Sequence, residues 1–335
     1  MGGVDGALAE LAGCPPLLLP GECDRLRARL AAVARGEAFL LAADDVAGGQ
    51  VAEAFGTLLR MAVVLSYAGA RPVVKVVGPL GDGAPARGTY QATAAALNLL
   101  RGLTAGHHTD VRRVHGEIQD FVARSPARAR HTRLTRRIAA AIRFMEACGA
   151  TPEALRRAEF FTGHEARDVA YERALTRTAE RGGRYGLSGH LLWLDGRTRR
   201  PDGPQVAYAA GIRNPLGVRL GPATAADEVP ALVDRLDPGR EPGRLTFLVR
   251  MGAAAVRDRL PGLVAKATAS GAPVGWVCDP VPDGTPARVL DEIGGFFEVL
   301  RALGGHPGGV RLELAGSRLG QEQALDLAFA LAELY

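Results

Sequence analysis

The chain of 335 residues is poor in several residue types that mark particular classes of protein. Its four cysteines are far apart and form no CxxC pair, so neither a disulfide framework nor a thiolate zinc site is expected. Only two positions are lysine, Lys75 and Lys266. The longest apolar stretch, residues 61–67, is far shorter than the ~20 residues of a membrane span, and the first residues contain no basic segment. These absences predict a cytoplasmic protein that is neither secreted nor membrane-bound.

Features of nucleic-acid and nucleotide binding are also missing. The net charge of +5 is a mild excess, and the arginine-rich segment 112–143 contains Phe121 as its only aromatic residue, so it lacks a stacking platform for bases. We interpret that segment as a solvated helix face. The sequence has no P-loop, no GxGxxG after a strand, no HExxH and no GxSxG. Nucleotide, zinc-protease and serine-hydrolase chemistry therefore have no motif to support them.

The chain does contain ample apolar material for a core, since 47% of its residues are hydrophobic. Short apolar runs bounded by turn residues alternate with longer amphipathic segments, which is the pattern of a parallel sheet covered by helices. Eight strands and eight helical intervals predict an α/β protein with a (β/α)₈ TIM barrel. The expected strands are 38–42, 72–77, 159–162, 191–194, 217–220, 245–250, 274–278 and 310–314. The second interval holds three expected helices, 90–103, 111–123 and 132–147. The other intervals hold one each, namely 50–68, 166–181, 205–213, 224–236, 254–270, 287–303 and 320–334.

The domain organisation follows from the same pattern. No repeat, linker or low-complexity segment divides the chain, which predicts one barrel domain over residues 1–335. Residues 1–36 precede the first strand as an N-terminal extension. Residues 89–150 form a helical insertion with extra helices between strands two and three.

Ionisable residues stand in or just after these apolar strands, where an unpaired charge costs several kcal/mol. In a barrel, the carboxyl ends of all strands open onto one mouth where the active site is built. Several guanidiniums at one mouth suit a phosphate or carboxylate, so the sequence predicts an anionic small-molecule substrate. The residues concerned are Asp44, Asp45, Lys75, His164, Glu165, Arg197, Arg199, Arg219, Arg250, Cys278, Asp279 and Glu313.

Two alternatives stay open. The charges could instead pair with one another, for example Arg219 with Glu313, Lys75 with Asp45, or Arg197 with Asp195 or Asp279. The His164-Glu165 pair could be a general acid and base, or an acidic residue at a helix N-terminus.

The strand segments resemble the class II 3-deoxy-D-arabino-heptulosonate 7-phosphate (DAHP) synthases, which condense phosphoenolpyruvate with erythrose 4-phosphate. The similarity includes RPVVKV at 71–76, FFTGHEA at 160–166, SGHLLWLDGRTR at 188–199, GIRNPLGVRLGP at 211–222, DPGREPGRLTFLVRMG at 237–252 and GGFFEVLRALGGHPGGVRLELAG at 294–316. It covers nearly the whole chain and implies a (β/α)₈ barrel with extra N-terminal elements. It also implies a homo-oligomer, since family members form oligomers and associate with chorismate mutase.

The resemblance implies roles for several basic residues. Arg197 and Arg250 match arginines that bind phosphoenolpyruvate, and Arg219 stands where the family has a lysine. Of the basic loop that binds the sugar phosphate, only Arg87 remains, and the long segment after it is almost absent. With Lys75, these residues form the expected substrate-binding set.

The metal ligands of the family are mostly missing by the same comparison. Val46 stands at the cysteine of GGDCAE, and Pro282 stands at the histidine of CDPMHGNT, whereas Glu313 remains. Valine and proline offer no donor atom. We therefore expect no cofactor. As a minority alternative, Asp44, Asp45, Asp283 and Glu313 could form an all-oxygen magnesium or manganese site.

These substitutions lead to a hypothesis of altered function. The chain is expected to be a diverged, metal-independent enzyme of aldol, retro-aldol or elimination chemistry in specialised-metabolite biosynthesis, with Glu165, His164, Glu313 and Asp45 as acid/base groups. The alternative is a non-catalytic paralogue that acts as a regulatory or scaffold subunit. Ordinary DAHP synthesis is the least favoured of the three. No nucleic-acid or membrane partner is expected.

Overall fold

The computed structural model describes residues 2–44, 46, 48–78, 86–151, 153–156, 158–282, 285–314 and 320–335. Of residues 2–5 and 48, only the backbone is described.

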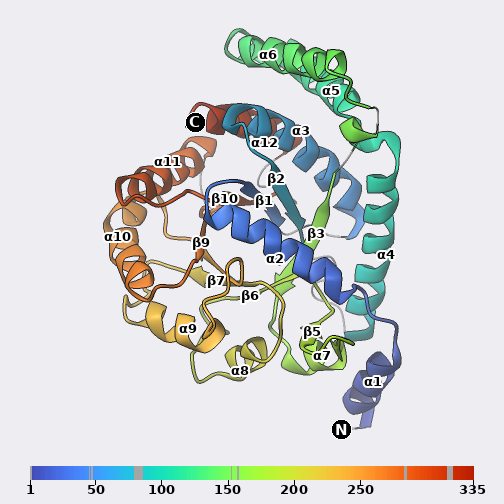
Figure 1. Ribbon diagram of the computed structural model, residues 1–335, viewed down its shortest axis with the longest axis vertical. Helices are drawn as coiled ribbons and strands as arrows, with labels where there is room; N and C mark the ends of the chain where they lie inside the picture. Colours follow the sequence, from blue (N-terminus) through green and yellow to red (C-terminus); the bar gives the residue numbers. More distant parts are fainter. Residues whose placement is uncertain are drawn as a thin grey trace.

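Eight parallel strands close into a barrel, as predicted (Figure 1). Around the barrel the order is β1, β10, β9, β8, β7, β6, β3, β2, and pairing of β1 with β10 closes the ring. Every predicted strand is present, with bounds shifted by a few residues. The strands are β1 (Phe39–Asp44), β2 (Val73–Val77), β3 (Phe160–Glu165), β6 (Leu191–Leu194), β7 (Leu216–Leu220), β8 (Leu245–Val249), β9 (Gly275–Cys278) and β10 (Gly309–Glu313).

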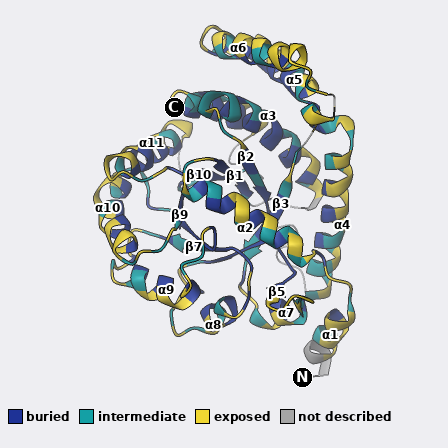
Figure 2. Cartoon of the chain, viewed as in Figure 1, coloured by how far each residue is buried: buried dark blue, intermediate teal, exposed yellow. Residues whose placement is uncertain are grey.

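Helices surround the barrel on its outer side (Figure 1). They are α3 (Val51–Gly69), α4 (Ala86–Ala105), α5 (Val111–Arg124), α6 (Arg128–Ala147), α7 (Val169–Ala174), α8 (Pro204–Ala210), α9 (Glu228–Leu236), α10 (Ala253–Ala269), α11 (Pro286–Ala302) and α12 (Gln321–Ala332). Between β2 and β3 the chain forms α4, α5 and α6, and the pair α5–α6 projects from the barrel with much of its surface exposed (Figure 2).

The helix α3 is the one described helix that is long and apolar enough to cross a membrane, by length and composition only. More than half of it is buried inside the protein. It packs against β1, β2 and α12, as a core helix of a barrel does.

Two helices in the N-terminal extension, α1 (Gly2–Gly13) and α2 (Pro20–Ala34), were not predicted. The apolar face of α2, formed by Leu26, Leu30 and Val33, packs against the side chains inside the barrel and closes its amino-terminal end (Figure 1). Gly243, just before β8, allows the chain to lie directly against the backbone of α2. Its φ is +76°, and a Cβ there would lie 2.0 Å from the carbonyl oxygen of Arg27. The mouth therefore lies at the opposite end of the barrel, at the carboxyl ends of the strands.

The predicted helix 166–181 is wrong in its second half. The helix α7 ends at Ala174, and the chain continues into an antiparallel hairpin of β4 (Thr176–Thr178) and β5 (Arg184–Gly186). Gly182 and Gly183 have φ of +81° and +89°, a conformation that only glycine adopts readily. The β-branched threonines before this turn favour a strand over a further helical turn.

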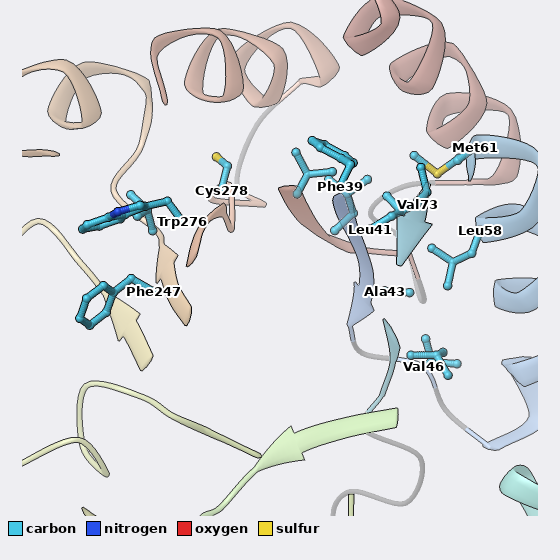
Figure 3. Close-up of a cluster of buried hydrophobic side chains, with 14 of the residues drawn as sticks. Phe39, Leu41, Ala43, Val46, Leu58, Met61, Val73, Phe247, Trp276 and Cys278 are labelled. Carbon is cyan, nitrogen blue, oxygen red and sulfur yellow. The ribbon is translucent and has the colours of Figure 1, made fainter. Parts of the chain in front are cut away.

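Alternate side chains of each strand separate two apolar clusters. Leu40, Val74, Val76 and Leu248 belong to the cluster inside the barrel, together with α2. Their strand neighbours, such as Phe39, Leu41 and Val73, belong to the larger cluster between barrel and helices (Figure 3). This alternation decides which charged residues can reach the mouth.

Candidate active site

The mouth gathers a set of inward-facing charged side chains at the carboxyl ends of the strands. On or just after β1, β3, β6, β8 and β9, the charged residue lies an even number of positions from an apolar residue inside the barrel. On β7 and β10, it lies next to residues that face outward, so it faces inward itself. The set consists of Asp44 on β1, Glu165 on β3, Asp195 after β6, Arg219 on β7, Arg250 after β8, Asp279 after β9, and Arg311 and Glu313 on β10.

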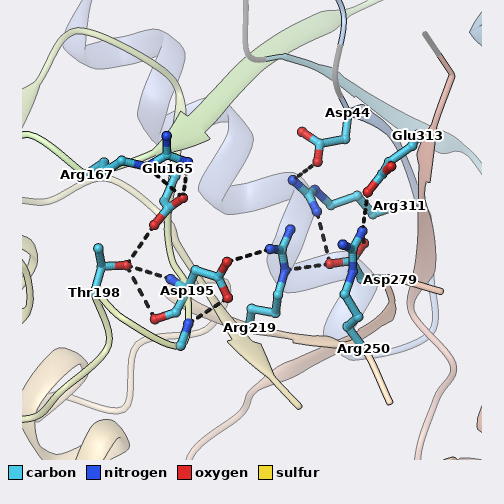
Figure 4. Close-up of polar contacts among 11 residues, drawn as sticks. Asp44, Glu165, Arg167, Asp195, Thr198, Arg219, Arg250, Asp279, Arg311 and Glu313 are labelled. Carbon is cyan, nitrogen blue, oxygen red and sulfur yellow. Dashed lines mark hydrogen bonds and ion pairs between the residues drawn. The ribbon is translucent and has the colours of Figure 1, made fainter. Parts of the chain in front are cut away.

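Asp279 is the centre of this set (Figure 4). One of its oxygens accepts hydrogen bonds from Arg219 Nε at 2.8 Å and from Arg311 Nη1 at 3.0 Å. Its other oxygen accepts a hydrogen bond from Arg250 Nη2 at 3.1 Å. The Asp279 side chain is 1% exposed. Three strands thus deliver their guanidiniums to one buried carboxylate.

Each arginine has a second acidic partner. Arg219 Nη1 lies 2.7 Å from Asp195 Oδ2, and Arg250 Nη2 lies 2.6 Å from Glu313 Oε1. Arg311 pairs with Asp44, and its guanidinium lies over the ring of Trp193, 4.4 Å from the ring centroid. The predicted convergence of Arg219 and Arg250 and the alternative of mutual pairing therefore occur together. The partners differ from those suggested, because Arg219 pairs with Asp195 and Asp279.

Charge pairing shifts the pKa values of this network. Burial would raise the pKa of Asp279, but Arg311, Arg219 and Arg250 hold it below its ordinary value. Burial would lower the pKa of Arg250, but Asp279 and Glu313 raise it above its ordinary value. Both groups are therefore ionised at neutral pH. Arg250 Nε is buried and has no hydrogen-bond partner among the described residues.

Glu165 lies at the side of the network (Figure 4). Its carboxylate accepts hydrogen bonds from Thr198 Oγ1 at 3.1 Å and from Arg167 at 2.7 Å. The side chain is 14% exposed. It is therefore positioned by two partners and still open to the mouth.

His164 and Lys75 point away from the mouth, into the layer between strands and helices. His164 Nε2 lies 2.7 Å from an oxygen of Glu172 on α7, and the other oxygen of that buried carboxylate accepts a hydrogen bond from Ser188 at 2.5 Å. Lys75 donates to the carbonyl oxygen of Val73 at 2.9 Å, and burial lowers its pKa to about 8. Neither side chain contacts the arginine network.

The other predicted residues are dispersed. Arg197 is exposed and has no hydrogen-bond or ion-pair partner within the described part of the chain. Arg87 lies in the first turn of α4 and pairs with Glu10 of α1 at 3.0 Å. Asp45 and Asp283 lie outside the described residues.

Sequence reasoning missed Arg311 and gave Asp279 and Asp195 only a pairing role. A signal for Arg311 was present. An arginine two residues before Glu313 in the same strand must face the same side of the sheet.

These features define a (β/α)₈-barrel protein with a polar site where the strands end, and the comparisons with known proteins assign the family. A model described as the class-II DAHP synthetase family matches residues 2–88 and 81–323. The chain therefore belongs to the class-II DAHP synthetase family.

Two curated relatives support this assignment. The chain is 41% identical over 412 residues to phospho-2-dehydro-3-deoxyheptonate aldolase of Streptomyces coelicolor, a match that covers 98% of this chain and 92% of that protein. It is 37% identical over 415 residues to phospho-2-dehydro-3-deoxyheptonate aldolase AroG of Mycolicibacterium smegmatis, covering 97% and 88%. Among solved structures it is similar to a truncated DAHP synthase from Thermotoga maritima, with a TM-score of 0.41, 11% identity, and coverage of 89% of this chain and 85% of that chain.

These relatives overturn the predicted change of function. The diverged metal-independent enzyme of specialised metabolism and the non-catalytic paralogue were both inferred from a few positions at the mouth. The identity to named aldolases extends over 98% of the chain and outweighs those positions.

The prediction that no cofactor is needed is likewise corrected, because the class II family to which the chain belongs uses a divalent metal. The described residues do not by themselves make up its site. Val46 is a buried hydrocarbon, and Asp44 and Glu313 are each paired with an arginine. Within the described ranges, no three His, Cys, Asp or Glu side chains come together as a metal site would require.

Proposed function

We propose that this chain is a DAHP synthase, which condenses phosphoenolpyruvate with erythrose 4-phosphate. The observation that carries the proposal is the 41% identity over 98% of the chain to a protein named for this product. The arrangement of the mouth agrees with an anionic substrate, since Arg219 and Arg250 come within hydrogen-bonding distance of one carboxylate.

In this proposal the arginines of the mouth bind phosphoenolpyruvate. Arg219 and Arg250 hold its carboxylate or phosphate, because a planar guanidinium binds two such oxygens at once. The Nε of Arg250 has no other partner among the described residues and is a donor for this anion. Arg197 is exposed on the loop after β6 and supplies a further cation, and Arg87 does so for the sugar phosphate.

Glu165 is our candidate for proton transfer. Its carboxylate faces the mouth, and Thr198 and Arg167 fix its orientation. Glu313 lies deeper and serves to hold Arg250. A divalent metal, if bound, would supply Lewis-acid activation of the aldehyde, although the described residues alone do not make up its site. The protein is proposed to work in the cytoplasm as a homo-oligomer of single-domain chains.

The test is formation of DAHP from the two substrates by the purified protein, with and without added Mn²⁺. We expect product from the native chain. Arg250→Ala should raise KM for phosphoenolpyruvate by about 30–150-fold, since a hydrogen bond between charged groups contributes ~2–3 kcal/mol. Arg200→Ala is the matched control, because Arg200 is exposed and pairs only with Asp202 among the described residues. Native protein that makes no DAHP with both substrates and metal present refutes the proposal.

A further inference from the structure

Arg219 is shared between two carboxylates that differ greatly in burial. Asp279 accepts from its Nε at 2.8 Å and is 1% exposed. Asp195 accepts from its Nη1 at 2.7 Å and is 37% exposed. The two carboxylates lie on opposite sides of the Arg219 guanidinium (Figure 4), and Asp195 is the more solvent-exposed of the two.

In this structure, resident carboxylates already occupy positions on the arginines that an anionic ligand would take. Three guanidiniums face four carboxylates, namely Asp44, Asp195, Asp279 and Glu313. A substrate with several negative charges that enters this network is repelled unless a carboxylate moves away. The question is which of the four can move.

The contacts single out Asp195. Asp279 is fixed by three arginines, and the side chains of Asp44 and Glu313 are 13% and 12% exposed. Among the described residues, the side chain of Asp195 is held, apart from Arg219, by one further hydrogen bond from the backbone N–H of Gly196, at 2.6 Å. The neighbouring residue, Gly196, is exposed, and a Cβ placed on it would meet no atom within 4 Å apart from its chain neighbours.

We propose that Asp195 is a resident carboxylate that occupies the ligand position on Arg219 and is displaced by the carboxylate or phosphate of the substrate. Asp279 stays in place as the positioning residue that orients Arg219 and Arg250. The inference rests on the proposed function for the identity of the anion. Displacement costs little because Asp195 is the most exposed carboxylate of the network, and ion pairs open to solvent change an equilibrium constant by about fivefold or less.

The two aspartates are therefore expected to have opposite effects on substrate affinity. Asp195→Asn removes a competitor from Arg219, so the Kd for phosphoenolpyruvate should fall by about two- to fivefold. Asp279→Asn removes the anchor of three guanidiniums, so the Kd should rise by about tenfold or more. A role of charge alone would instead tighten binding in both variants, because each loses one negative charge.

The experiment is calorimetric titration of the full chain with phosphoenolpyruvate alone. Asp202→Asn is the matched control, since Asp202 is 78% exposed and pairs with Arg200. It should bind as the native chain does. Asp195 is partly exposed, so its variant is expected to fold and decides the proposal even if Asp279→Asn does not fold. In the DAHP assay, Asp195→Asn should lower the KM for phosphoenolpyruvate together with the Kd.

The outcomes separate this inference from the proposed function. Tighter binding by Asp195→Asn supports displacement, and weaker binding by folded Asp279→Asn supports positioning. Unchanged or weaker binding by Asp195→Asn, tighter binding by Asp279→Asn, or native protein that does not bind phosphoenolpyruvate overturns the inference. A different result is that the native protein binds phosphoenolpyruvate and the two variants shift its Kd in opposite directions as predicted, but no DAHP is formed. In that case the proposed function alone is wrong.

Discussion

Arg311 is the most deeply buried cation of the mouth, and its removal gives the sharpest test of how the network contributes to stability. Its side chain is 4% exposed, it pairs with Asp279 and Asp44, and it stacks on Trp193. Arg311→Met keeps most of the apolar packing but leaves both carboxylates without this partner. Removing one member of a buried ion pair costs ~3–5 kcal/mol, so the free energy of unfolding should fall by about that amount.

The measurement is urea unfolding at pH 7, with Arg301→Met as the control. Arg301 also lies over an aromatic ring, that of Phe297 at 5.3 Å, but it is exposed, so its loss should cost about 1 kcal/mol or less.

The same reasoning predicts the pH dependence of stability. Arg311 helps to hold the pKa of Asp279 below its ordinary value, and stability from such a group is present above the unfolded pKa and lost as pH falls. The difference in free energy of unfolding between the native chain and Arg311→Met should therefore narrow below pH ~4. If Arg311→Met lowers the free energy of unfolding no more than Arg301→Met does, the reasoning is refuted.

Two other buried groups give further predictions. Burial lowers the pKa of Lys75 to about 8, so the native protein should gain stability as pH rises from ~8 to ~10, and Lys75→Met should flatten that rise by roughly 2 kcal/mol. Unfolding of Lys75→Met and of Lys266→Met, whose lysine is 49% exposed, at pH 7.5 and 9.5 tests this, and equal slopes in both variants contradict it. Glu172→Ala leaves His164 and Ser188 without their buried acceptor and should cost ~3 kcal/mol in thermal or urea unfolding, with a smaller loss for Glu172→Gln. A loss below ~1 kcal/mol for Glu172→Ala would show that the buried carboxylate does not hold this cluster together.

The barrel itself was predictable because its signal is local and repeated. Each strand is a short run of outward and inward apolar residues, and eight such runs separated by helical intervals leave few architectures other than a closed barrel. The hairpin β4–β5 was missed because the apolar period of α7 continues into it, while the glycines of the hairpin turn, Gly182 and Gly183, come only several residues after the helix ends. The position of α2 across the amino-terminal end of the barrel could not be predicted. Its apolar face is short, and it packs against side chains inside the barrel.

Some of the charged residues named from the sequence lie together in the structure and others do not, and strand parity explains most of the difference. Charges at the ends of strands do converge, as Arg219, Arg250 and Glu313 show. His164 and Glu165 are adjacent in one strand, so only one of them can face the mouth, and Lys75 lies between two interior valines of β2. Which acid pairs with which arginine depends on the stagger of neighbouring strands around the ring, and a sequence does not contain that information.

Stability alone does not account for this network. Replacing a buried ion pair by apolar residues of similar volume is often neutral or stabilising, and the remaining interior of this barrel is apolar at the corresponding positions of Val76, Leu248 and Val277. Asp279 and its three arginines could therefore be exchanged together for hydrocarbon without loss of the fold. Our proposed function explains their presence at the carboxyl ends of the strands, where β7, β8 and β10 open to the mouth, because the guanidiniums then meet a charge that comes from outside. In the same proposal, Asp195, the less buried carboxylate on Arg219, lies on the side from which that charge arrives.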